Sequence, residues 1–170
     1  MVNKAKFGKG NWPHQAELAD IFGNPSVKGW GGKNLVYVSA PFKMYIGKTP
    51  IHGFYVHKCC AESITRILNK AWEVCGHSQA KIDAEHISQF SGSWVVRNMR
   101  GLGTLSCHAY GLALDFNAGQ NPLGSIPGRH AGSFTENSLL VKLFEEEGWE
   151  WGGGWSGRKD GMHFQAARTR

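Results

Sequence analysis

The segment from Lys58 to Cys75 constrains the fold of this chain most strongly, because its apolar residues recur at the spacing of an α-helix. The stripe consists of Cys60, Ile64, Ile67, Leu68, Ala71, Val74 and Cys75. Charged residues lie mostly off this stripe, and Gly76 follows it at the position of a C-terminal cap. We therefore expect one long amphipathic helix that covers a hydrophobic core and takes no part in chemistry.

Shorter elements flank this helix. Helices are expected at 14–22 and 137–147, and three glutamates at 145–147 should form a solvated helix end. Extended segments are expected at 35–38, within 42–57, and at 93–100, 113–116, 149–155 and 162–165. Pro41 should limit the first strand, and residues 117–134, rich in Gly and Pro, should form a long loop. This order predicts an α+β domain in which a small antiparallel sheet packs against the long helix.

Length and composition indicate a globular chain. The 170 residues suit one ordinary domain with a full core, so residues 1–170 are treated as a single domain. Hydrophobic residues make up 41% and charged residues 19% of the chain, a balance that excludes intrinsic disorder.

The formal net charge is +6, which favours anionic partners such as nucleic acid, anionic membranes and bacterial envelope polymers. Basic residues are scattered, with local clusters only near the two chain ends, and no nucleic-acid-binding motif stands out. Charge alone therefore does not choose among these partners, but the missing motif argues against nucleic acid.

Targeting signals and cysteines point to a reducing compartment. The first residues carry positive charge without a following apolar stretch, unlike a signal peptide, and no window reaches the length of a membrane span. We expect synthesis in the cytoplasm, with any export by another route. The four cysteines, Cys59, Cys60, Cys75 and Cys107, are expected to be reduced thiols.

The densest chemical signal is the segment Ser-Cys-His-Ala-Tyr-Gly-Leu-Ala-Leu-Asp at 106–115. His108 and Asp115 stand seven residues apart, and Asp115 ends a short apolar strand that should enter the core. A buried carboxylate is costly unless it is paired or bound to a metal. Gly111 is small enough for the backbone to pass close to another group.

A second signal, Asp160-Gly-Met-His163, follows a turn rich in Gly and Trp. Together the two segments supply two imidazoles, one carboxylate and a spare carboxylate, which is the composition of a catalytic zinc site with an open fourth position. In such a site zinc activates a water, while Asp160 accepts its proton and returns it to the leaving amine. A nearby arginine would help to stabilise the oxyanion.

The combined pattern, S-x-H-x-x-G-x-A-x-D followed by D-x-x-H, resembles the M15 peptidase family. This family comprises D-alanyl-D-alanine carboxypeptidases and dipeptidases and the L-alanyl-D-glutamate endopeptidases of bacteriophage endolysins. The chain is most similar to the endolysin-like branch, through Arg97-Asn-Met-Arg-Gly101 before the first motif and Gly148-Trp-Glu-Trp-Gly-Gly153 before the second. The similarity covers roughly residues 91–165, and residues 1–50 match only loosely.

The resemblance implies a hedgehog/DD-peptidase-like fold and a role for each residue that matches a motif. It implies zinc ligands at His108, Asp115 and His163. It implies a general base at Asp160 and a substrate-binding arginine at Arg97, with Arg100 as the competitor.

Three further residues, Ser106, Cys107 and Trp155, lie in or beside the motifs. Ser106 resembles a serine that contacts substrate. Trp155, like Trp151, either lines the groove or covers the core beneath it. Cys107 departs from the family pattern, and alternation along an extended chain would point its thiol away from the metal.

The working hypothesis is a monomeric zinc peptidase that cuts the L-Ala–D-Glu bond of the peptidoglycan stem peptide. It would act on the anionic envelope after another protein breaches the membrane. One alternative is a D-alanyl-D-alanine carboxypeptidase or dipeptidase. Another is an inactive zinc-containing wall-binding module, against which Asp160 argues, since a structural site needs no spare carboxylate.

Overall fold

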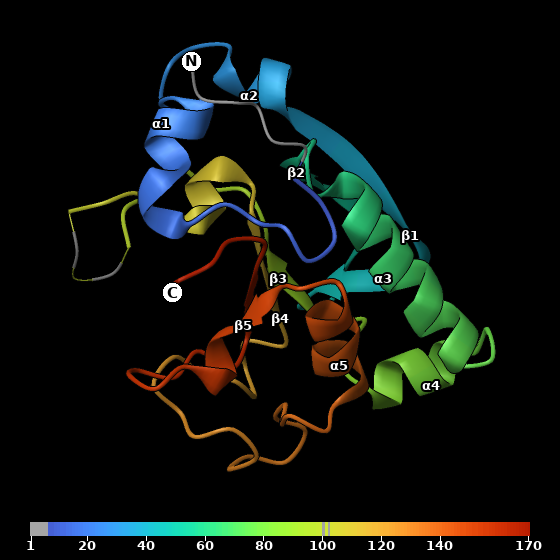
Figure 1. The fold of residues 1–170 in the computed structure, drawn as a ribbon. Coiled ribbons are helices and arrows are strands. Elements are labelled where there is room, and N and C mark those ends of the chain that lie inside the picture. The colour runs from blue at the N-terminus through green and yellow to red at the C-terminus, as the bar shows by residue number, and fades with distance from the viewer. Residues whose placement is uncertain (1–6, 100, 102) are drawn as a thin grey trace.

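The computed structural model describes residues 7–99, 101 and 103–170, and its helices and strands form an α+β fold (Figure 1). The helices are α1 (Leu18–Phe22), α2 (Trp30–Asn34), α3 (Ala61–Val74), α4 (Gln79–Ala84) and α5 (Leu139–Glu146), with 3-10 turns η1 (Gln15–Glu17), η2 (Cys107–Tyr110) and η3 (Gly152–Gly154). The strands are β1 (Leu35–Ile46), β2 (Thr49–His57), β3 (Phe90–Gly92), β4 (Ala113–Phe116), β5 (Glu150–Trp151) and β6 (His163–Gln165). The fold class expected from the sequence is confirmed.

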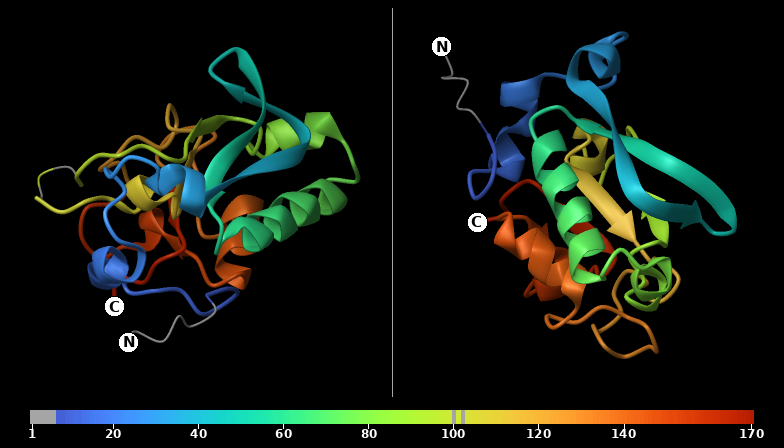
Figure 2. Two further views of the ribbon diagram at one scale, coloured as in Figure 1. Left: turned by 90° about the horizontal axis from the view of Figure 1, so that it is seen from above. Right: turned by 90° about the vertical axis from the view of Figure 1, so that its right-hand side faces the viewer.

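Strands β1 and β2 form a long antiparallel hairpin, which is a sheet of its own (Figure 2). The expectation that Pro41 limits the first strand is wrong, because β1 continues to Ile46. The pairing register shifts between Ser39 and Met44, and Pro41 lies in this irregular stretch. Proline is tolerated there because a bulged residue need not donate a ladder hydrogen bond.

The second sheet is antiparallel, with strand order β3-β4-β6-β5. In the β4–β6 pair, Asp115 lies directly opposite His163. Side chains of directly opposed residues project from the same face of a sheet. The pairing register therefore brings together two candidate ligands that are 48 residues apart in sequence.

The expected strand at 93–100 is wrong for its described residues, 93–99. They form only an isolated bridge between Asn98 and Leu105. Trp94, Val95 and Val96 are 40–46% exposed, and no strand among the described residues pairs with this segment. The competitor Arg100 lies outside the described residues.

Aromatic contacts join the hairpin, the four-stranded sheet and α5 into one core. Phe54 of β2 stacks on Phe90 of β3 with ring centroids 4.5 Å apart, and Phe90 meets the edge of Phe116 in β4. Phe144 of α5 stacks on Phe164 of β6 at 4.4 Å. This rigid packing fixes the strands that carry the candidate ligands.

Helix α3 is the expected amphipathic helix and packs against β1 and α5. It ends at Val74, and Gly76 follows with a φ of 63°, the left-handed conformation of a C-terminal glycine cap. Of the expected stripe, Val74 is 54% exposed and does not join the core, whereas Cys75 is buried in it.

The expectation of a fully solvated glutamate run after α5 is wrong for Glu147. Its side chain is 7% exposed and accepts hydrogen bonds from Arg66 at 2.7 and 3.0 Å and from Ser63 at 2.9 Å. These partners compensate for burying the carboxylate, so Glu147 ties the end of α5 to α3.

The segment before α1 is tied to the last residues of the chain. The backbone N–H of Gln15 donates to the carbonyl of Arg168 at 2.8 Å, and the N–H of Arg168 donates to the carbonyl of Pro13 at 2.8 Å. Trp12 is buried beside Trp149, with ring centroids 5.7 Å apart. These contacts hold η1 next to β6.

Two further expectations concern membranes and thiols. Within the described part of the chain, no helix combines the length and apolar character needed to cross a bilayer. Cys59, Cys60, Cys75 and Cys107 are all free cysteines, as expected.

Candidate metal centre

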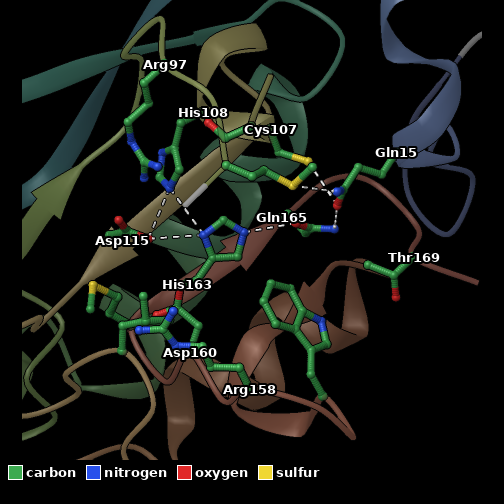
Figure 3. A pocket seen from close by; sticks show the side chains of 15 residues that line it. Gln15, Arg97, Cys107, His108, Asp115, Arg158, Asp160, His163, Gln165 and Thr169 are labelled. Carbon is green, nitrogen blue, oxygen red and sulfur yellow. Dashed lines mark hydrogen bonds and ion pairs between the residues drawn. The ribbon is translucent and has the colours of Figure 1, made fainter. Parts of the chain in front are cut away.

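Three side-chain atoms form a compact triangle at one face of the four-stranded sheet (Figure 3). His108 Nε2 lies 3.2 Å from Asp115 Oδ1, and His163 Nδ1 lies 3.3 Å from the same oxygen. The third edge, from His108 Nε2 to His163 Nδ1, is 3.2 Å. The two histidines are buried, whereas the side chain of Asp115 is 17% exposed.

The backbone around η2 places His108 beside the two strand residues. Gly111 ends η2 with a φ of 68°, in the left-handed region that favours glycine. A Cβ at this position would lie 2.8 Å from the backbone nitrogen of His57 and 2.7 Å from a methyl of Leu35. The expectation that Gly111 permits a close backbone approach is therefore confirmed.

Hydrogen bonds on the outer side of each imidazole indicate its tautomer. His108 Nδ1 lies 2.6 Å from the carbonyl oxygen of Ser93, which only accepts, so Nδ1 carries the proton. His163 Nε2 lies 2.9 Å from Oε1 of Gln165, the amide oxygen. In the neutral form that binds a metal, a ring held in this way turns a lone pair inward, as a metal-binding histidine does when an oxygen holds its other nitrogen.

The donor set fits a zinc ion. Zinc bonds of about 2.0–2.2 Å to nitrogen and oxygen at tetrahedral angles separate the ligand atoms by about 3.3–3.6 Å. The observed separations of 3.2–3.3 Å are close to that range. Two inward lone pairs and a carboxylate oxygen would repel one another without a cation between them. The cluster can therefore hold a metal ion, and two imidazoles with one carboxylate suit zinc.

Charge coupling within the cluster is strong. In the metal-free cluster, burial raises the pKa of Asp115, but hydrogen bonding and charge from His108 and His163 outweigh it and lower that pKa well below its usual range. Burial lowers the pKa of His163, yet the carboxylates of Asp115 and Asp160 more than compensate and raise it. The site thus favours an ionised Asp115 carboxylate together with a positive charge, either on His163 or on a bound cation.

The triangle opens into a cavity of about 340 Å³. Seven of the residues considered from the sequence line it, namely Arg97, Ser106, His108, Asp115, Trp155, Asp160 and His163. Arg97 approaches from the side of His108, whereas Asp160 lies on the side of His163 (Figure 3). The tertiary structure therefore gathers the whole proposed site around one cavity.

Asp160 is placed by the glycine-rich turn that precedes it. Its backbone N–H donates to the carbonyl of Gly152 at 3.0 Å, and a Cβ on Gly152 would lie 2.5 Å from the carbonyl oxygen of Asp160. The N–H of His163 donates in turn to that carbonyl of Asp160 at 3.2 Å. This compact turn places Asp160 and His163 in the wall of the same cavity.

The cavity wall also includes a polar residue, Ser106, and an aromatic residue, Trp155. Ser106 is buried, and its hydroxyl has no hydrogen-bond partner among the described residues. Trp155 packs against the imidazole of His163, with ring centroids 5.4 Å apart. Trp151 belongs to the core instead, with its indole N–H donating to the carbonyl of Gly161.

Cys107 does not follow the expected alternation, because residues 107–110 form a 3-10 turn and not an extended strand. Its sulfur lies 3.6 Å from Oε1 of Gln15 (Figure 3). The thiol is buried, and burial raises its pKa to about 12, so it stays protonated.

Sequence reasoning missed several residues of this cavity. Leu123 comes from the long loop, Arg158 and Met162 flank Asp160, and Gln15 comes from η1. Gln165 was not singled out, although its position two residues after His163 in a strand puts both side chains on one face. No sequence signal marks Gln15, because its place depends on the pairing of the two chain ends.

Comparison with known proteins gives one match at this site. Residues 100–166 match a family model described as D-alanyl-D-alanine carboxypeptidase, of the M15 peptidases. This match spans the three cluster residues and Asp160, and it supports the M15 family and a metallopeptidase.

A second family model, for histone-like transcription factors (CBF/NF-Y) and archaeal histones, matches residues 53–90. This segment contains the amphipathic α3 with strand residues on both sides. The match covers this one helix and its flanks, and by itself it assigns no nucleic-acid-binding function. Searches of curated proteins and of solved structures found no match.

Proposed function

We propose that this chain is a zinc-dependent peptidoglycan peptidase, namely a phage endolysin that cuts the L-Ala–D-Glu bond of the stem peptide. The observation that supports this most is the triangle of His108, Asp115 and His163, whose edges suit tetrahedral zinc, beside a cavity that also holds Asp160. The match to the M15 family supports the reaction class. The net charge of +6 suits work on an anionic envelope.

His108, Asp115 and His163 would hold the ion. When bound, zinc polarises the scissile carbonyl and activates a water for attack on it. Asp160 would accept the proton of the attacking water on its carboxylate and return it to the leaving amine. A purely structural site does not require such a carboxylate, so its place in the cavity wall speaks against an inactive wall-binding module.

The other cavity residues would bind the substrate. Arg97 would pair with a substrate carboxylate or with the oxyanion, because its guanidinium borders the cavity and its hydrogen bond to the Asn98 carbonyl is long at 3.4 Å. The buried Ser106 hydroxyl would gain a partner from the peptide backbone. Trp155 would form an apolar wall against the stem peptide.

A second candidate is a D-alanyl-D-alanine carboxypeptidase or dipeptidase, favoured by the description of the matching family model. Both reactions need the same metal and general base, so the choice between them depends on the shape and charge of the groove. We propose that the protein acts as a monomer on the wall, after another protein has breached the membrane.

Lysis of outer-membrane-permeabilised bacteria tests the class of activity. Turbidity should fall rapidly, a chelator should abolish the clearing, and added zinc should restore it. Clearing that persists in excess chelator would contradict a zinc peptidase.

Digestion of purified peptidoglycan then identifies the bond. New N-terminal D-glutamate, detected by mass spectrometry of the products, would support the endopeptidase. Release of D-alanine without new D-glutamate termini would replace it with the second candidate.

A further inference from the structure

We propose that Gln15, in the N-terminal segment, is a positioning residue for the candidate ligand His163, acting through Gln165. This inference rests on the proposed zinc site. It gives the N-terminal part of the chain, which the family model leaves unmatched, a specific place in the metal centre.

The first link runs from the ligand to Gln165. His163 Nε2 donates to Gln165 Oε1 at 2.9 Å, which leaves Nδ1 free to face Asp115. Gln165 is 1% exposed, so this amide has no access to solvent. The tautomer and the ring orientation of His163 therefore depend on which end of the Gln165 amide faces the ring.

The second link fixes the orientation of that amide. Gln165 Nε2 donates to Oε1 of Gln15 at 3.2 Å and to the carbonyl of Ala167 at 3.0 Å. A flipped amide would turn its oxygen toward both of these oxygens and its NH2 toward His163. Gln15 thus supplies one of the two acceptors that keep the amide oxygen on the imidazole.

The orientation of Gln15 is itself determined by its neighbours. Its Nε2 donates to the sulfur of Met99 at 3.0 Å, and its Oε1 also accepts from Cys107 at 3.6 Å. Cys107 precedes the ligand His108, and Gln165 follows His163 by two residues. One amide oxygen therefore contacts both segments that carry histidine ligands (Figure 3).

The backbone holds Gln15 in place for this role. Its N–H donates to the carbonyl of Arg168, and the Arg168 guanidinium donates to the carbonyl of Trp12 at 2.9 Å. The segment is thus attached to the strand end that follows Gln165. A side chain on such an anchored backbone loses little further entropy on forming its hydrogen bonds.

The test is the zinc dissociation constant, measured by competition with a chelator for wild type and three variants. Gln15→Met keeps the length and packing of the side chain but removes the acceptor, and it should weaken zinc binding by about 10-fold or more. Gln15→Glu keeps an oxygen acceptor and should stay close to wild type. Glu17→Met, at an exposed position in the same turn, is the matched control and should not change the constant.

Two controls separate positioning from general destabilisation. Thermal unfolding of the metal-free variants identifies the temperature at which all are folded, and the constants are compared there. The visible absorption of bound cobalt, which reports ligand geometry, should change for Gln15→Met and not for Glu17→Met. If Gln15→Met does not fold, the comparison of Gln15→Glu with Glu17→Met still tests the proposal. Gln15→Glu keeps the oxygen acceptor, so zinc binding weaker than that of the control Glu17→Met would overturn the role of this acceptor.

The possible failures are distinguishable. Equal zinc affinity and equal cobalt spectra for wild type and Gln15→Met would overturn the role of Gln15 and leave the zinc site intact. A wild-type protein that binds no zinc would overturn the proposed function together with this inference.

Discussion

His108 Nε2 and His163 Nδ1 lie 3.2 Å apart, each with its outer nitrogen held by an oxygen acceptor. When both rings are neutral with protons on the outer nitrogens, two lone pairs face each other across this short distance beside the Asp115 carboxylate. A cation between them turns three mutually repelling donors into ligands. The short distance between these two nitrogens is therefore the main structural support for a metal centre.

Removing one ligand should abolish zinc binding. For Asp115→Asn and His163→Ala, we expect the zinc content to fall from about one ion per chain to nearly none, because only two strong ligands remain. Elemental analysis of protein dialysed against trace zinc measures this. His130→Ala, an exposed histidine in the long loop, is the matched control and should keep its zinc. Full zinc content in both ligand variants would place the metal elsewhere.

Replacing the proposed general base should separate chemistry from metal binding. Asp160→Asn should retain zinc but lower the rate of peptidoglycan hydrolysis by about 10²–10⁴-fold, since the amide does not accept the water proton. Release of soluble peptides from purified walls measures the rate. Asp20→Asn, an exposed carboxylate of α1, should leave it unchanged. An Asp160→Asn variant with wild-type activity would remove Asp160 from the mechanism.

The buried Glu147 should contribute to stability. Glu147→Gln loses the ionic part of its bonds with Arg66, so we expect a loss of about 1–2 kcal/mol in the free energy of unfolding, moderated by the half-exposed guanidinium. Urea titration of the metal-free protein measures this. Glu146→Gln, the exposed neighbour, should change it little.

The contribution of Glu147 should also depend on pH. Burial raises the pKa of Glu147, but hydrogen bonds from Arg66 and Ser63 outweigh it and lower the pKa. A depressed folded-state pKa stabilises the protein above the unfolded value of about 4.3, and this stabilisation disappears as pH falls through the folded value. The difference between wild type and Glu147→Gln should be full at pH 7 and shrink below about pH 4. A difference that grows on acidification would contradict this pairing.

Cys59 should be the reactive thiol of the chain. Hydrogen bonding from Cys60 and the nearby His57, whose Nδ1 lies 3.0 Å from the sulfur, overcome burial and lower the pKa of Cys59 to about 6. Burial raises the pKa of Cys60, Cys75 and Cys107.

Alkylation by iodoacetamide at pH 7, followed by peptide mapping, should therefore label Cys59 first. Its rate should rise with pH through about 6 and then level off. Cys59→Ser should lose this fast phase. A rate that still climbs steeply between about pH 7 and 9 would show an ordinary thiol pKa.

The local patterns of the sequence were sufficient for the long helix, for the short strand at 113–116 and for seven of the residues that line the cavity. Helical spacing and the His-Asp and Asp-His motifs are short-range features, so a few consecutive residues encode them. The same reasoning failed where neighbours far along the chain decide. Residues 93–99 have strand-like composition but no adjacent strand, and Glu147 looks solvated until α3 brings Arg66 beside it.

The sequence by itself determined the chemistry of the donors. Histidine supplies an imidazole nitrogen and aspartate a carboxylate oxygen in any fold, so the residue types alone fix the kind of ligand atom. What only the tertiary structure decided is their geometry. The β4–β6 register opposes Asp115 to His163, and the joined chain ends put Gln15 against Gln165. Long-range pairing sets distances of about 3 Å between residues that are tens of positions apart, and no local periodicity encodes such distances.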